Sequence, residues 1–164
     1  MDYQIFSMEP DDWAEVRKIY GEGISTGNAT FETELPDWEK WDNAHRKDCR
    51  LVVRGKNEVI GWATLSPVSA RRVYAGVAEV SVYVAAAARG KGVGKALLKA
   101  LIEGSERAGI WTLQAGIFPE NVASIALHKS FGFREVGVRK SIAKLGKMWR
   151  DVVLLERRSS IIGV

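Results

Sequence analysis

The spacing of apolar and polar positions predicts strands and helices along the whole chain. Apolar side chains recur every three or four residues after Pro10, at Trp13, Val16, Ile19 and Tyr20, which is typical of a helix. By this criterion and by turn residues, helices are expected at residues 10–23, 36–47, 93–108 and 121–130. Strands are expected at residues 2–7, 50–54, 59–66, 77–84, 110–118, 133–142 and 148–158.

The order of these elements indicates the class of fold. Gly55, Lys56 and Asn57 suit a tight turn between the second and third strands. The helix at 93–108 lies between two strands and predicts a strand–helix–strand crossover, which is right-handed by the general rule. We therefore predict a mixed α/β (α+β) fold. No repeat or linker divides the sequence, so residues 1–164 are expected to form one domain.

Composition narrows the classes of function. The net charge of +4 fits a phosphate-rich ligand but is too small to indicate nucleic acid binding. No apolar run approaches the roughly 20 residues that cross a bilayer, and the N-terminus lacks a signal-peptide pattern. The single cysteine, Cys49, cannot form an internal disulfide. We expect a soluble cytoplasmic protein without a membrane or nucleic acid partner.

One segment carries the clearest chemical signal. The strand at 77–84 leads into Arg89-Gly-Lys-Gly-Val-Gly-Lys95, and a helix begins at once. Glycines allow a ligand to approach the backbone, and the N–H groups at a helix N-terminus favour anions. Lys95 is followed by Ala96 and not Ser or Thr, which excludes a P-loop. The glycine spacing also differs from that of a dinucleotide fingerprint, so a pyrophosphate held in another way is expected.

Two motifs in this order resemble the GNAT superfamily of N-acetyltransferases. The first is the glycine-rich segment, and the second is residues 121–133, an asparagine-led helix that ends in Gly-Phe. Residues 69–74, 78–84 and 149–151 are similar to the phosphinothricin and methionine sulfoximine N-acetyltransferase branch. The resemblance implies a mostly antiparallel sheet of about seven strands with about four helices. It also implies acetyl-CoA as cosubstrate, no metal, and a homodimer.

The resemblance assigns residues to the cosubstrate. The backbone of the strand at 77–84 would hold the acetyl oxygen and the pantetheine arm, and the glycine-rich segment would hold the pyrophosphate. The residues assigned to cosubstrate binding are Val82, Tyr83, Val84, Arg89, Gly90, Lys91, Gly92, Val93, Gly94, Lys95, Asn121 and Ser124. For Asn121, helix capping is the alternative role.

The resemblance also assigns catalytic and acceptor residues. Glu79 stands where the branch places its general base, and a solvent-facing strand residue is the alternative. His128 stands where many family members place an acid, with a structural role as the alternative. The residues expected to bind the acceptor are Phe31, Arg72, Val73, Tyr74 and Glu79, with Trp149 as a further apolar wall. Arg72 would bind a carboxylate, although Arg71 could be the ligand instead.

The resulting hypothesis is acetyl transfer to the amino group of a small amino acid, in a ternary complex with acetyl-CoA. Acceptors of the phosphinothricin, methionine sulfoximine or methionine sulfone type would match the branch. The alternatives are acetylation of a protein or peptide and a non-catalytic acetyl-CoA-binding module.

Overall fold

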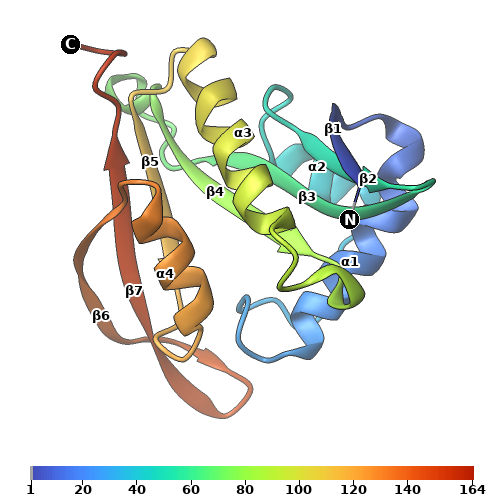
Figure 1. The fold of residues 1–164 in the computed structure, drawn as a ribbon. Coiled ribbons are helices and arrows are strands. Elements are labelled where there is room, and N and C mark those ends of the chain that lie inside the picture. The colour runs from blue at the N-terminus through green and yellow to red at the C-terminus, as the bar shows by residue number, and fades with distance from the viewer. Residues whose placement is uncertain (1) are drawn as a thin grey trace.

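Seven strands form one sheet with helices on both of its faces in the computed structural model, which describes residues 2–164 (Figure 1). The strands are β1 Tyr3–Ser7, β2 Leu51–Gly55, β3 Glu58–Pro67, β4 Val77–Val84, β5 Thr112–Ile117, β6 Arg134–Leu145 and β7 Met148–Arg158. The α-helices are α1 Trp13–Ser25, α2 Trp38–Ala44, α3 Val93–Arg107 and α4 Val122–Ser130. Short 3₁₀ turns are η1 Pro10–Asp12, η2 Arg72–Tyr74 and η3 Ala86–Ala88.

The strand order is β1-β2-β3-β4-β5-β7-β6. Every neighbouring pair is antiparallel except β4 and β5, which are parallel and joined through α3. This confirms the predicted mixed fold and its mostly antiparallel sheet. The predicted turn at residues 55–57 joins β2 to β3 as a hairpin, with Lys56 at a positive φ of 58°.

Each face of the sheet has its own apolar layer. Helices α3 and α4 lie in front of the sheet in Figure 1, and α1 and α2 lie behind it. Leu97, Leu98 and Leu101 of α3 pack on the front face, against side chains that include Val80 of β4. Val16 of α1 packs on the back face in a layer rich in aromatic rings.

Strand β4 belongs to both layers because its side chains alternate. Val80, Val82 and Val84 belong to the α3 layer, whereas Tyr83 packs in the α1 and α2 layer. Glu79 and Ser81 share the second face with Tyr83, as the sequence predicts. A catalytic group at Glu79 therefore faces away from α3.

Several element boundaries differ from the predicted ones. The helix expected at 36–47 is shorter, because Asp37 caps it by accepting a hydrogen bond from the Lys40 N–H at 2.8 Å. Strand β6 extends beyond residue 142 to Leu145. Its pairing with β7 is interrupted by a bulge at residues 140–142, which a periodic pattern does not reveal.

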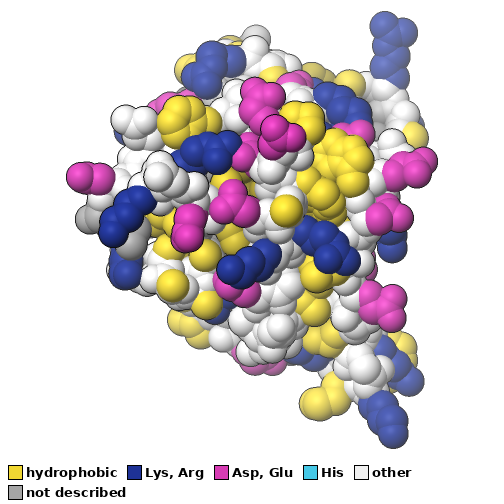
Figure 2. All heavy atoms as spheres, turned by 90° about the vertical axis from the view of Figure 1, so that its right-hand side faces the viewer, with side chains coloured by type: hydrophobic (Ala, Val, Ile, Leu, Met, Phe, Trp, Pro, Cys, Tyr) yellow, Lys and Arg dark blue, Asp and Glu magenta, His cyan; other side chains and the backbone are white. Residues whose placement is uncertain are grey.

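Surface and membrane properties follow from the same structure. Figure 2 shows acidic and basic side chains interspersed on the face that carries α1 and β1. Within residues 2–164, no helix has the length and apolarity needed to cross a membrane. Cys49 is half-buried, and burial raises the pKa of its thiol, which disfavours the reactive thiolate.

Candidate active site

A cleft opens where β4 and β5 stop pairing. The two strands are hydrogen-bonded only from Val77 to Glu79 on β4 and from Thr112 to Gln114 on β5. Beyond these residues β4 continues with β3, and β5 continues with β7. The strands consequently diverge around a cavity of about 1070 Å³ that α3, α4 and residues 26–31 also line.

The divergence leaves backbone groups of β4 without a partner strand. The Ala85 N–H donates to the Ile60 carbonyl of β3 at 2.9 Å. Because backbone groups alternate in direction along a strand, those of Val84 and Val82 point to the other side, into the cleft. Their N–H groups are suitably placed for the predicted contacts with an acyl and pantetheine group, whereas the Val84 carbonyl accepts a hydrogen bond from Arg89 Nε at 3.3 Å.

The anion-binding end of the cleft lies at the start of α3. Gly90 and Gly92 have positive φ values of 73° and 83°, which glycine adopts without strain. The first helical hydrogen bond runs from the Ala96 N–H to the Gly92 carbonyl, so the preceding N–H groups have no acceptor within the helix. The side chains of Arg89 and Lys95 line the same end. This donor set fits a pyrophosphate.

Lys91 is the exception among the residues predicted for the cosubstrate. Its Nζ donates to the Ala87 carbonyl at 2.9 Å, and the side chain lines a separate hollow beside α1. The remaining residues of that predicted set all line the cleft, namely Val82, Tyr83, Val84, Arg89, Gly90, Gly92, Val93, Gly94, Lys95, Asn121 and Ser124.

Asn121 combines capping with a second contact. Its Oδ1 accepts a hydrogen bond from the Ser124 N–H at 3.3 Å, which makes it the N-cap of α4. Its Nδ2 donates to the Asn28 carbonyl at 3.3 Å. The residue therefore joins α4 to the segment at 26–31 across the mouth of the cleft.

His128 lines the cleft but is a poor proton donor. Only 4% of the residue is exposed, and its Nδ1 lies 2.7 Å from the Ser124 carbonyl oxygen. Since a carbonyl can only accept, Nδ1 carries the proton and Nε2 carries the lone pair of the neutral ring. Burial lowers the pKa of His128, so the neutral form prevails at pH 7. This geometry favours the structural role over the acid role.

Glu79 lies at the point where β4 and β5 separate. Its Oε1 accepts a long hydrogen bond of 3.4 Å from Gln114 Nε2 on β5. A Cβ at Gly116 would lie 3.8 Å from the same oxygen, so the absence of a side chain there leaves space beside the carboxylate. The neighbouring Tyr83 is not suited to act as the general base in place of Glu79, because burial raises the pKa of its phenol and keeps it protonated.

The predicted acceptor residues divide into two groups. Phe31 lines the cleft and packs edge-to-face on Phe118, with ring centroids 4.9 Å apart. Arg72, Val73 and Tyr74 form the exposed turn η2, before β4 begins, and lie outside the cleft lining. Trp149 also lies outside it, is 59% exposed, and carries Lys144 over its ring at 5.0 Å. A role of this second group in binding the acceptor therefore stays a prediction.

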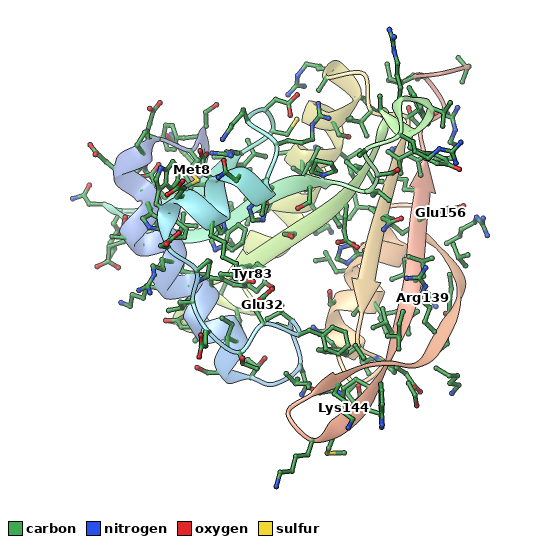
Figure 3. All side chains as sticks on the ribbon, turned by 180° about the vertical axis from the view of Figure 1, so that it is seen from behind. Met8, Glu32, Tyr83, Arg139, Lys144 and Glu156 are labelled. Carbon is green, nitrogen blue, oxygen red and sulfur yellow. The ribbon has the colours of Figure 1, made fainter. Side chains whose placement is uncertain are left out.

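Other residues of the cleft were not predicted. Gly116 and Phe118 come from β5 and its end, and Arg139 and Val152 come from β6 and β7. Their positions depend on the antiparallel pairing of β5 with β7, and no local sequence pattern indicates that pairing. Figure 3 shows Arg139 beside β7, across the cleft from Glu32 and Tyr83.

The Arg150 side chain binds the segment at residues 26–31 through hydrogen bonds. Its guanidinium donates to the Gly27 carbonyl and to Asn28 Oδ1, both at 2.9 Å, and pairs with Glu120 at 3.2 Å. The same group lies 4.1 Å from the centroid of the Phe118 ring. The segment that carries Phe31 is thus bound to β7.

Comparison with known families identifies this architecture. The family model described as "Acetyltransferase (GNAT) family" matches residues 13–133, which include β4, the glycine-rich segment and α4. The chain belongs to the GNAT acetyltransferase family. This confirms the resemblance drawn from the two motifs.

Two curated relatives resemble this GNAT chain over most of their length. A phosphinothricin N-acetyltransferase of Streptomyces coelicolor is 33% identical over 90% of this chain and 91% of its own. The L-methionine sulfoximine/L-methionine sulfone acetyltransferase of Pseudomonas aeruginosa is 29% identical over 88% of each chain. The chain is therefore an N-acetyltransferase close to these enzymes.

Solved structures of GNAT proteins share the fold. A ribosomal-protein-alanine N-acetyltransferase from Brucella melitensis has a TM-score of 0.88 and 32% identity, covering 95% of this chain and 99% of its own. A phosphinothricin acetyltransferase from Sinorhizobium meliloti in complex with acetyl-CoA has a TM-score of 0.86 and 29% identity, covering 96% and 89%.

Proposed function

We propose that this N-acetyltransferase acetylates the amino group of a small amino acid of the phosphinothricin or methionine sulfoximine type. The observation that carries the proposal is the position of Glu79. Its carboxylate lies where β4 and β5 diverge, on the sheet face opposite α3, and it lines the cleft. An amine that approaches from this face would meet both the carboxylate and the unpaired backbone of β4.

Different residues of the cleft would bind acetyl-CoA and accept the proton of the amine. The N-terminus of α3 with Arg89 and Lys95 would hold the pyrophosphate of acetyl-CoA, and the backbone of Val82 and Val84 would hold its acyl arm. Such fixed donors near a developing oxyanion can contribute a few kcal/mol to catalysis. The group at the base position, Glu79, would accept the proton of the ammonium directly or through water.

In the transfer itself, the neutral amine would attack the thioester carbonyl. The carbon–nitrogen bond forms, the carbon–sulfur bond breaks, and the thiolate departs. The proton that Glu79 took from the ammonium returns to solvent, and the second proton of the nitrogen passes through water to the departing thiolate. Nε2 of His128 carries no proton to give at neutral pH, so the proposal assigns no acid to this residue.

The alternative acceptor is a peptide or protein amine. The similarity of this chain to the ribosomal-protein-alanine N-acetyltransferase of Brucella melitensis supports this alternative function. The exposed Arg71 and Arg72 near η2 would then lie where an acidic peptide could bind. The homodimer and the cytoplasmic location remain predictions, of which light scattering would test the first.

A thiol-release assay with acetyl-CoA tests the proposal. The acceptors are phosphinothricin, methionine sulfoximine, methionine sulfone, the common amino acids and a peptide with a free N-terminal alanine, and mass spectrometry identifies each product. Acetylation of at least one of the first three supports the proposal. Acetylation of the peptide alone favours the alternative function.

A further inference from the structure

Two of the charged side chains that line the cleft form no ion pair with any described residue and lie away from its anion-binding end. The charged residues of the lining are Glu79, Arg89, Lys95, Glu120 and Arg139. Arg89 and Lys95 lie at the anion-binding end, and Glu120 is paired with Arg150 at 3.2 Å. Within residues 2–164, Arg139 has no ion-pair partner. Away from the anion-binding end, the cleft therefore offers one carboxylate and one guanidinium.

These two groups lie on the same face of the sheet. Arg139 is paired with Val152 of β7, whereas the next residue of β7, Val153, packs in the opposite layer with α3. A Cβ at Gly116 would lie 3.3 Å from Val152 Cγ1 and 3.8 Å from Glu79 Oε1. Glu79, Gly116, Val152 and Arg139 thus follow one another across the floor of the cleft.

The bulge in β6 fixes where Arg139 lies. Pairing with β7 stops at Arg139 and resumes at Ala143, opposite Arg150. Between them Ser141 adopts a positive φ of 45°, and its N–H donates to Asp151 Oδ1 at 2.7 Å. This hydrogen bond also lowers the pKa of Asp151, so the carboxylate that holds the bulge stays ionised. Although β6 is an edge strand, the backbone just after Arg139 is therefore held by Asp151 of β7.

We propose that Arg139 determines acceptor specificity by binding an oxyanion of an amino acid whose amino group meets Glu79. The inference rests on the proposed function and names the acceptor charge that its site selects. A zwitterion matches a cleft with a carboxylate on one side and a guanidinium on the other, since guanidinium binds carboxylate and phosphinate oxygens in a bidentate manner.

The spacing suits a small acceptor. Arg139 lies on β6, three strand spacings from Glu79 on β4, which is at least about 14 Å between the two backbones at about 4.8 Å each. Arg139 and Glu79 both line the cleft, so their side chains shorten the span that the acceptor must bridge. Arg72 lies outside this space, on η2. Arg139, unlike Arg72, therefore lines the same cleft as Glu79.

The oxyanion has two possible sources, the α-carboxylate and an acidic side chain. Three acceptors separate them: phosphinothricin carries both groups, methionine sulfone carries only the carboxylate, and methyl(3-aminopropyl)phosphinate carries only the phosphinate. Steady-state kinetics with each acceptor are measured for the wild type, Arg139→Met, Arg139→Lys and Arg72→Ala. The control is Lys147→Met, which removes the same charge from the exposed turn between β6 and β7.

We expect Arg139→Met to raise the acceptor KM about tenfold or more, as the loss of a charge-assisted contact predicts. The kcat and the KM for acetyl-CoA should change little, because the contact exists before and during transfer. Arg139→Lys should fall between, and Lys147→Met should behave as the wild type. An effect on both amino acids but not on the aminopropyl compound identifies the carboxylate, and an effect on both phosphinates but not on the sulfone identifies the side chain.

Two results would overturn the inference in different ways. If the wild type is active but Arg139→Met leaves every acceptor KM unchanged, or Arg72→Ala alone raises it, the assignment of Arg139 is wrong while the proposed function stands. If the wild type releases no thiol with any of these acceptors, the proposed function fails and the assignment fails with it.

Discussion

Replacing Arg150 by alanine should release the segment at 26–31 from β7. The substitution removes two hydrogen bonds from a charged donor, of which the bond to Gly27 is part-buried and contributes about 1.5–3 kcal/mol, whereas the bond to Asn28 is exposed and contributes less. It also removes the ion pair to Glu120, which is 59% exposed, so solvent screening leaves the pair a minor contribution. The stacking on Phe118 adds about 0.5–2 kcal/mol. Since such contributions are not additive, we expect a loss of about 3 kcal/mol.

A loss of that size leaves a folded protein, because domains are typically stable by about 5–15 kcal/mol. Urea denaturation measures the free energy of unfolding, and hydrogen exchange measures the protection of residues 26–31. Arg150→Lys should recover part of the loss, and Glu120→Gln should change the free energy of unfolding far less than Arg150→Ala does. A loss below about 1 kcal/mol in Arg150→Ala, with unchanged exchange at 26–31, would refute the assigned role of these contacts.

Three further predictions concern single residues. In Glu79→Gln, turnover should fall at least about tenfold at neutral pH, since general bases contribute about 10²–10⁴-fold, while calorimetry should give the wild-type affinity for acetyl-CoA; full activity would mean that another group takes the proton. Gly94→Val should sharply weaken acetyl-CoA binding, because its methyl groups would occupy the cleft beside the N-terminus of α3, and unchanged affinity in a folded variant would contradict the pyrophosphate site. The lowered pKa of His128 means that the unfolded chain binds a proton first, so stability should decline as the pH falls below about 7. His128→Phe should make the free energy of unfolding, measured by denaturation between pH 5 and pH 8, less dependent on pH. The dependence should not vanish, because burial also lowers the pKa of His45. An unchanged pH dependence would exclude His128 as a contributor.

Local patterns in the sequence determined the elements and one end of the site. The alternation in residues 77–84 places Glu79 and the valines on opposite faces, and the structure confirms it. The glycines at 90 and 92 indicated a backbone that only glycine adopts easily, and both have positive φ. These features are readable because they depend on neighbouring residues: the period of a strand, the conformational freedom of glycine and the donors at the start of a helix.

The acceptor end depended on contacts between distant segments. Arg139 and Val152 line the cleft only because β7 lies between β5 and β6 and because Asp151 holds a bulge in β6. Arg72 and Trp149, which the resemblance placed at the acceptor, lie outside the cleft of one chain. Strand order and bulges are fixed by the packing of the whole sheet and not by local periodicity. The sequence by itself therefore determined the fold class and the cosubstrate end of the site, whereas the tertiary structure alone decided which side chains face Glu79.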